Sequence, residues 1–284
     1  MLIPHLLLYL IILPCSLIGI ISTNSQEKGA KNLDEILDKC SVYCEMLANA
    51  SLFFVCTERI EETRYEYYFP KYSYAREPFA RKVEDNSYVY DYQLMKKGNR
   101  IEEKRILLEE SGKKKNEINA QLKTKIFYSK RSVFGPVGLL ARKNHNKYNY
   151  KTIDEESVHG RKAVIIEATP KSEMKNMPNY GKVWVDRQDY SILKIEVAEE
   201  SLVGIEQAKE TSKSKSTPMI SVTHYYDEVY KTDEDRVIRF PSKTVFLHET
   251  YLSIRGYRNK VIAAKTQFFY DNYRFFTVDV DVKY

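Results

Sequence analysis

Three cysteines lie close together near the start of the chain, and their thiols could form a disulfide or bind a metal ion. Cys40 and Cys44 are spaced i, i+4, on one face of a predicted helix, and Cys56 lies in the strand predicted to follow. Because no histidine lies nearby and no C-x-x-C spacing occurs, the three are a poor set of zinc ligands. In an oxidising compartment they favour one disulfide among the three, with one thiol left free.

The histidines and acidic runs offer little further chemistry. Beyond the N-terminal segment the histidines are isolated from one another: His145, His159, His224 and His248. No H-E-x-x-H, G-x-S-x-G or phosphate-loop motif occurs in the sequence. The acidic run Asp233–Asp235 and the pair Asp279 and Asp281 supply too few oxygen ligands for calcium. We therefore predict no catalytic residue, no metal site and no cofactor, and expect a protein that is not an enzyme.

The N-terminal segment indicates export. Leu6–Ile21 is almost wholly apolar, and its 16 residues fall short of a membrane span but suit the hydrophobic region of a secretory signal. Cleavage is expected after Ser25, with lipidation of Cys15 or an uncleaved N-terminal anchor as the alternatives. We therefore predict a signal peptide or anchor at 1–25, a linker at 26–32, and a location in the periplasm or cell envelope.

The composition is that of a folded protein. Of the 284 residues, 43% are hydrophobic and 30% are charged, with only 10 glycines and 9 prolines, which excludes disordered and low-complexity chains. The net charge is +6, and basic residues cluster at 113–115, 123–130 and 209–215. These clusters are typical of solvated loops, with peripheral contact to anionic lipid as the alternative. The export signal argues against a nucleic-acid partner.

Hydrophobic periodicity predicts one long helix followed by many strands. Asn32 is the predicted N-cap of a helix that runs to Asn49. A short middle helix begins within Phe134–Leu140 and ends near Asn144, and Ser111–Asn119 is a predicted loop. The segments with strand-like alternation are Leu52–Phe69, Ser87–Lys96, Arg100–Glu109, Tyr148–Glu155, Lys162–Thr169, Lys182–Val185, Ile192–Val197, Met219–Tyr230, Val237–Thr250, Lys260–Phe276 and Val278–Tyr284.

This succession predicts the fold class α+β, mainly β. Many strands joined by short turns favour one antiparallel sheet, and strands this long should curl around the apolar faces of the two helices. We therefore expect residues 33–284 to form a single domain, with a curved sheet covered by the N-terminal helix and the short middle helix.

One hairpin carries a resemblance to a known family. Gly181–Asp186 followed by Asp189–Glu196 resembles the G-x-hydrophobic-W-hydrophobic-D hairpin of outer-membrane lipoprotein-sorting (LolA-like) proteins. Arg239–Lys243 and Asp271–Phe276 are similar to later strands of that family, and the closest resemblance is to its long uncharacterised bacterial members. The resemblance implies an incomplete antiparallel barrel closed by helices, with an apolar cavity for lipid acyl chains.

The expected function follows from that cavity. The residues that we expect to line it are Trp184, Ile192, Phe246 and Phe268. For Trp184 the alternative is ordinary core packing, because strand alternation places it opposite Val183 and Val185. We predict a periplasmic protein that binds a lipid or lipidated protein in the half-barrel. The alternative is an envelope structural or sensing module that binds another protein through its sheet and basic loops.

Overall fold

The structure is a computed structural model, which describes residues 21–50, 53–68, 77–97, 100–127, 137–172, 180–202, 219–231, 237–254 and 257–276. The predicted cleavage signal up to residue 20 with Cys15, the acidic run Asp233–Asp235, the basic cluster 209–215 and the strand Val278–Tyr284 lie outside these residues. None of the helices within the described ranges is long and apolar enough to cross a membrane.

The N-terminal helix α1 spans Ile21–Ala50. Its end agrees with the prediction, but its predicted start at Asn32 is wrong, because the helix continues through the expected linker at 26–32. A polar N-cap such as Asn32 favours a helix start without preventing a helix from extending further. The buried apolar residues of α1 recur every three or four positions, as an amphipathic helix requires, and they are Ile36, Leu37, Cys40, Tyr43, Cys44 and Leu47.

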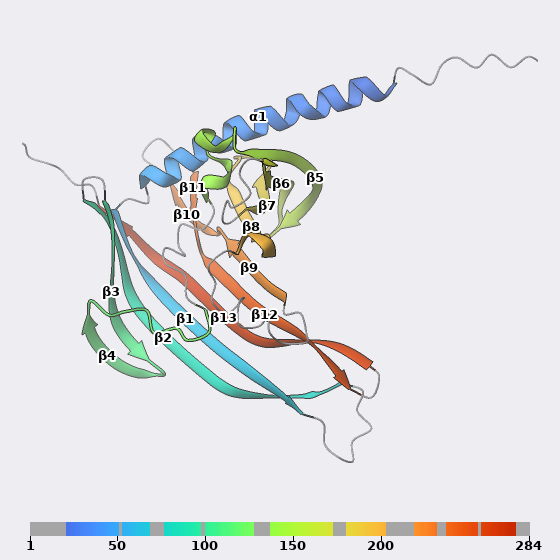
Figure 1. The fold of residues 1–284 in the computed structure, drawn as a ribbon. Coiled ribbons are helices and arrows are strands. Elements are labelled where there is room, and N and C mark those ends of the chain that lie inside the picture. Colours follow the sequence, from blue (N-terminus) through green and yellow to red (C-terminus); the bar gives the residue numbers. More distant parts are fainter. Residues whose placement is uncertain are drawn as a thin grey trace, which may run out of the picture.

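The strands form one eleven-stranded antiparallel sheet in the order β4-β3-β2-β1-β13-β12-β9-β8-β7-β6-β5, which confirms the predicted mainly-β fold class (Figure 1). Its members are β1 (Phe53–Tyr68), β2 (Phe79–Lys97), β3 (Arg100–Glu110), β4 (Lys113–Ile118), β5 (Tyr148–Val158), β6 (Arg161–Pro170), β7 (Gly181–Asp186), β8 (Ile192–Val197), β9 (Met219–Tyr225), β12 (Lys243–Ile254) and β13 (Tyr257–Phe275). A separate hairpin pairs β10 (Glu228–Lys231) with β11 (Val237–Phe240).

Three further differences separate the predicted elements from the structure. The short middle helix is two 3₁₀ turns, Val137–Leu140 and Arg142–Asn144. The predicted loop Ser111–Asn119 contains β4, whose residues are all exposed and which pairs only with β3 at the sheet edge. An edge strand without a buried face has no hydrophobic alternation, so its sequence resembles a loop.

The third difference is that the two long strands predicted around the acidic turn are each interrupted. Tyr226 and Asp227 separate β9 from β10, and Pro241 and Ser242 separate β11 from β12. The proline has no backbone N–H for a sheet ladder, which favours a break at this position. The backbone N–H of Ser242 donates to Tyr225 O at 2.8 Å and keeps the two breaks side by side.

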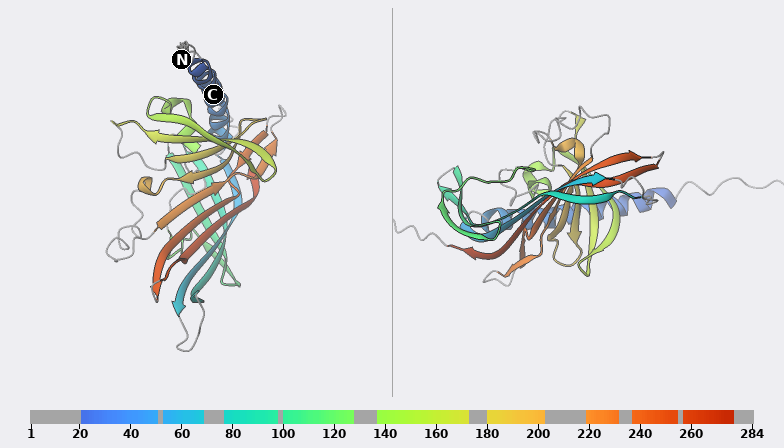
Figure 2. Two further views of the ribbon diagram at one scale, coloured as in Figure 1. Left: turned by 90° about the vertical axis from the view of Figure 1, so that its right-hand side faces the viewer. Right: turned by 90° about the horizontal axis from the view of Figure 1, so that it is seen from below.

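One face of the sheet, which we call the inner face, buries two apolar clusters with different covers (Figures 1 and 2). The helix-covered cluster packs β6, β7 and β8 residues such as Val183 and Ile195 against α1 and the 3₁₀ turns. The segment-covered cluster lies on the long strands β1, β2, β12 and β13, which extend beyond α1, and includes Phe54, Ile60 and Phe268.

The opposite face carries a smaller cluster around Trp184, with members on β5, β6 and β8. Val183 and Val185 belong instead to the helix-covered cluster, so the alternation that places Trp184 opposite them is confirmed. The indole Nε1–H of Trp184 donates to Glu156 Oε2 at 2.7 Å, and Lys194 Nζ lies 4.0 Å above its ring. This tryptophan therefore packs on the outer face of the sheet.

Candidate ligand site on the inner face of the sheet

A single row of side chains crosses five strands of the inner face and changes from apolar to polar along its length. Val222 of β9 pairs with Phe246 of β12, which pairs with Thr266 of β13. Thr266 pairs in turn with Glu62 of β1, and Glu62 pairs with Asn86 of β2. Residues that are directly opposite in antiparallel strands project to the same face, so this row forms one continuous strip.

An irregular segment, Asn119–Phe127, crosses this part of the inner face and covers the strip (Figure 1). It begins where the Ala120 N–H donates to Arg105 O at 2.9 Å, and the Lys123 N–H then donates to the Tyr90 hydroxyl at 3.2 Å. Phe127 stacks on Phe246 with ring centroids 4.4 Å apart. In the part of the chain that the structure describes, this cover is therefore an irregular segment of the protein itself.

Glu62 holds the last residues of that segment. Its side chain is fully buried, and its carboxylate accepts the Ile126 N–H at 2.9 Å and the Lys125 N–H at 3.0 Å. The Thr266 hydroxyl is a more distant donor at 3.4 Å. Among the residues that the structure describes, no cation forms an ion pair with Glu62. A buried carboxylate needs donors in place of water, and here main-chain N–H groups supply them.

Glu58, four residues earlier on the same face of β1, is satisfied differently. Its carboxylate accepts Arg105 Nε at 2.6 Å and Nη2 at 3.1 Å, a bidentate ion pair that is almost completely buried. The Arg105 guanidinium also lies 4.4 Å from the Tyr92 ring centroid. A bidentate arginine pair fixes both partners in orientation as well as in charge. Glu58 therefore has a permanent partner, whereas the partners of Glu62 belong to an irregular segment.

Two polar atoms near Glu62 are buried without a hydrogen-bond partner in the described part of the chain. Asn86, directly opposite Glu62, has its side-chain Nδ2 unpaired, and the Oγ1 of Thr124 on the covering segment is also unpaired. Such groups cost free energy and are uncommon in folded proteins. The polar end of the strip therefore contains an unused donor beside a carboxylate acceptor.

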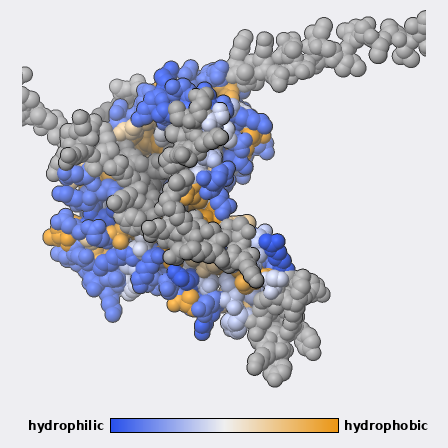
Figure 3. Space-filling view, viewed as in Figure 1, coloured by the Kyte–Doolittle hydropathy of each residue, from blue (hydrophilic) through white to orange (hydrophobic). Residues whose placement is uncertain are grey.

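The four predicted cavity residues do not share one site. Phe246 and Phe268 both lie in the segment-covered cluster, and each contacts Phe127, with centroid distances of 4.4 Å and 6.1 Å. Ile192 belongs to the helix-covered cluster, and Trp184 lies on the outer face. The space-filling view shows hydrophobic residues in the indentation between the body beneath α1 and the long lower strands (Figure 3).

The predicted disulfide is not formed, and Cys40, Cys44 and Cys56 are buried free thiols. Cys40 Sγ donates to Tyr190 O at 3.3 Å, so Cys40 faces the β7–β8 turn. Cys44 Sγ donates to Val137 O at 3.4 Å, so Cys44 faces the 3₁₀ turn Val137–Leu140. Cys56 lies in the other inner-face cluster. Burial raises the pKa of the Cys44 thiol to about 12, which disfavours the reactive thiolate.

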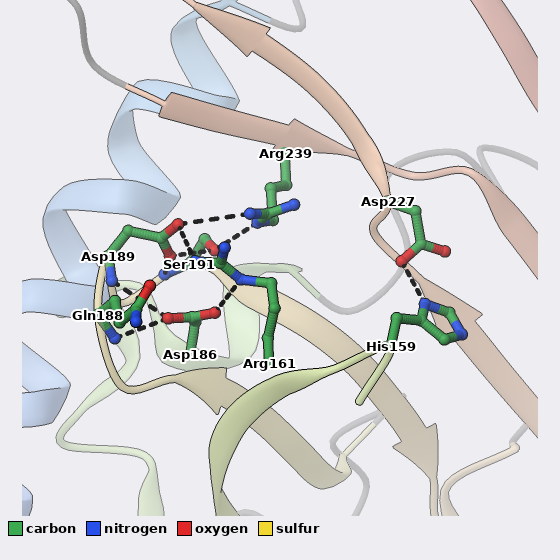
Figure 4. Close-up of polar contacts among 8 residues, drawn as sticks. All are labelled: His159, Arg161, Asp186, Gln188, Asp189, Ser191, Asp227 and Arg239. Carbon is green, nitrogen blue, oxygen red and sulfur yellow. Dashed lines mark hydrogen bonds and ion pairs between the residues drawn. The ribbon is translucent and has the colours of Figure 1, made fainter. Parts of the chain in front are cut away.

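The conspicuous polar network of the protein surrounds the β7–β8 turn (Figure 4). Arg161 bonds to Asp186 and, through Nη2, to Asp189 Oδ2 at 2.8 Å, while Arg239 Nε donates to Ser191 Oγ at 2.9 Å. Burial alone would raise the pKa of Asp186, but the hydrogen bonds from Arg161 and from two backbone N–H groups lower it. Asp186 and Asp189 therefore connect the β7–β8 turn to Arg161 of β6 and Arg239 of β11.

The histidines remain apart in the structure. His159 Nδ1 lies 2.7 Å from Asp227 Oδ1 at the surface (Figure 4), and the Ser242 hydroxyl donates to the other oxygen of Asp227 at 2.9 Å. His224 is buried and its Nδ1 lies 2.9 Å from Thr244 Oγ1. Over the described ranges, no group of three histidine, cysteine or acidic residues is arranged to hold a metal ion.

Sequence reasoning missed Glu62, Asn86 and Thr266. A signal for one of them was available, because Phe54, Cys56 and Ile60 alternate on β1 with Glu58 and Glu62 in the same phase. Acidic residues on the apolar phase of a strand indicate buried charge with a dedicated partner. The partners themselves lie far away in the sequence and could not be identified from it.

No family model matches the chain, and no curated protein matches it. Several solved structures are similar to it at low identity. A LolA superfamily protein from Nitrosomonas europaea is 14% identical, covers 86% of this chain and 94% of its own, and has a TM-score of 0.36. A putative outer membrane lipoprotein-sorting protein domain from Vibrio parahaemolyticus is 11% identical, with 90% and 94% covered and a TM-score of 0.35.

A third solved structure, a DUF1329 family protein from Desulfovibrio piger, is 13% identical, with 88% of this chain and 94% of that chain covered and a TM-score of 0.31. The chain is thus structurally similar to LolA superfamily and lipoprotein-sorting domains at low sequence identity. These include the family that the hairpin Gly181–Glu196 resembles.

Proposed function

We propose that this protein binds the alkyl chain of a lipid or lipidated ligand on the inner face of its long strands, in the cell envelope. The observation that carries the proposal is that the apolar residues on the long strands are covered by an irregular segment of the chain. Apolar residues of seven strands belong to this cluster, and the part of the chain described over it is an irregular nine-residue segment, Asn119–Phe127. An apolar surface with such a cover is suited to exchanging it for an apolar ligand.

The covering segment is attached at few points. Its described hydrogen bonds to the sheet come from the backbone N–H groups of Ala120, Lys123, Lys125 and Ile126. The Lys123 side chain also donates to Glu110 of β3 and Glu117 of β4. Its apolar anchors are Ile126 and Phe127, which are 4% and 3% exposed. A ligand chain that occupies the place of Phe127 against Phe246 and Phe268 would bury a comparable apolar area, so exchange need not expose the sheet to water.

The test is equilibrium binding of an uncharged fluorescent alcohol, pyrenyl decanol, to the purified protein. We expect saturable binding with one probe per chain. Because the segment competes with the ligand, Phe127→Ala should bind the probe about 10-fold more tightly, which corresponds to the burial of one phenylalanine side chain. Phe268→Leu should bind it more weakly, because the floor of the site is altered.

Phe269→Ala is the matched control, since Phe269 neighbours Phe268 on β13 but lies on the other phase of the strand, against Arg59. Its probe affinity should equal that of the wild type. Native mass spectrometry of protein purified from cells should also show a mass increment from retained lipid. Absence of saturable probe binding in both the wild type and Phe127→Ala would overturn the proposal.

The other candidate is an envelope module that binds a partner protein. It is favoured by the same segment, because the described inner face is filled by the protein's own side chains. The two candidates differ in the probe experiment. A protein-binding module with a permanent core should lose stability in Phe127→Ala without gaining affinity for an alkyl probe.

A further inference from the structure

We infer that the polar end of the inner-face strip, formed by Glu62, Asn86 and Thr266, selects an alkyl ligand with an uncharged amide head and excludes fatty carboxylates. This inference rests on the proposed function and specifies the ligand class of the same site. It starts from the row Val222, Phe246, Thr266, Glu62 and Asn86, which is apolar at one end and polar at the other.

The first argument is the fate of Glu62 when the covering segment is displaced. Its carboxylate then loses the N–H groups of Lys125 and Ile126, which lie 3.0 Å and 2.9 Å away. The side chain is fully buried, and no described cation pairs with it. A buried carboxylate without donors is strongly unfavourable, so a ligand must bring a hydrogen-bond donor of its own to this point.

The second argument is Asn86. Its Nδ2 is buried and unpaired while the segment is in place, directly across the β1–β2 pair from Glu62. A ligand group that accepts from Asn86 and donates to Glu62 would satisfy both. A single amide does so, because its carbonyl accepts and its N–H donates. The covering segment already places two backbone amides, those of Lys125 and Ile126, against Glu62, so an amide group is known to fit at this point.

The third argument concerns the excluded ligand. A carboxylate head carries no donor for Glu62 and adds a second negative charge beside a buried one. Two carboxylates that lie side by side in a low-dielectric interior repel each other strongly. The alkyl chain of the ligand would extend from Glu62 over Thr266 to Phe246 and Val222, which lie at successive strand spacings of about 4.8 Å.

The experiment measures displacement of pyrenyl decanol by two ligands with the same chain, dodecanamide and dodecanoate. In the wild type, dodecanamide should displace the probe at least about 10-fold more effectively, the factor expected from leaving one buried polar group unpaired. In Glu62→Gln the repulsion is removed and the preference should fall to within about 3-fold, mainly because dodecanoate gains affinity.

Glu61→Gln is the matched control, because Glu61 is the neighbouring residue on the other phase of β1, exposed and paired with Arg59. It should keep the wild-type preference. Asn86→Leu provides a second, independent variant, which should weaken dodecanamide because the amide carbonyl loses the Asn86 Nδ2 donor. This variant keeps the inference testable even if Glu62→Gln does not fold.

Hydrogen exchange supplies a readout that core packing alone would not change. Dodecanamide should speed the exchange of the Lys125 and Ile126 amides, because the ligand takes their acceptor. Probe binding with equal displacement by both ligands would overturn the inference and leave the proposed function intact. So would unchanged protection of these two amides in the dodecanamide complex. Absence of probe binding would overturn both.

Discussion

Two carboxylates on one face of β1 show how the surroundings of a residue decide its role. Glu58 and Glu62 occupy equivalent phases of the strand, and both are fully buried. Glu58 is neutralised by Arg105 from the same sheet, whereas Glu62 is held by backbone N–H groups of Asn119–Phe127. The first arrangement is structural, and the second can be exchanged with a ligand.

The Glu58–Arg105 pair leads to a stability prediction. Arg105→Met leaves the Glu58 carboxylate buried without its cation, and should lower the free energy of unfolding by about 3–5 kcal/mol. The double variant Glu58→Met/Arg105→Met removes both charges and should recover most of that loss. Urea unfolding followed by the fluorescence of Trp184 measures both variants. A double variant no more stable than Arg105→Met would contradict this account of the pair.

His224 leads to a pH prediction. Burial lowers its pKa to about 4, below the value of 6.5 that it has when unfolded. The unfolded chain therefore binds the proton first as the pH falls, so the contribution of neutral His224 is complete above pH 6.5 and is lost between about pH 6.5 and 4. From these two pKa values the loss at pH 5 is about 2 kcal/mol.

The measurement is the urea midpoint at pH 7.5 and pH 5.0 for the wild type and for His224→Gln, which cannot be protonated. The decrease between the two pH values should be smaller in the variant by about 2 kcal/mol. His159→Gln is the control, since His159 is exposed at the surface. Equal pH dependence in the wild type and His224→Gln would refute the assignment.

At the scale of elements, the β7–β8 hairpin is constrained at both its turn and its entry. Its turn is fixed by the network of Arg161, Asp186 and Asp189, and its entry is fixed by Gly181. A Cβ at Gly181 would overlap the carbonyl oxygen of Glu196 and come within 2.8 Å of Ala198 N. Both are backbone atoms, Glu196 in the paired strand β8 and Ala198 directly after it, so neither can move without disturbing the hairpin.

Gly181→Ala should therefore destabilise the protein by about 2–3 kcal/mol or prevent folding, because the strand pairing must open to accept the methyl group. Gly138→Ala is the matched control, since the nearest atom to its added Cβ is Asn144 Nδ2 at an ordinary 3.6 Å. That variant should stay within about 0.5 kcal/mol of the wild type in thermal or urea unfolding. Equal stabilities would contradict the close approach at Gly181.

At the scale of the whole molecule, one sheet carries two clusters on its inner face, and each has a different kind of cover. The helix α1 packs against the cluster on β6, β7 and β8, whereas the described cover of the long strands is the irregular segment Asn119–Phe127. Local opening is easiest where few apolar contacts hold a segment. The two halves of the sheet should therefore differ in local stability.

Hydrogen exchange of the ligand-free protein tests this difference. The amides of Lys125 and Ile126 should exchange through local opening, well before the amides of β8, whose strand is paired on both sides. Their opening free energy should lie below that of global unfolding. Exchange of the two groups at the same rate would show that the covering segment is a permanent part of the core.

The sequence by itself determined the mainly antiparallel fold, most strand positions, the end of α1 and the two phases of β7, because local alternation encodes which residues face the core. Only the tertiary structure decided the start of α1, the free state of the cysteines and the strip from Val222 to Asn86. Strand register between distant segments is set by packing of the whole sheet. For that reason Phe246 could be predicted as a candidate, whereas its alignment with Glu62 could not.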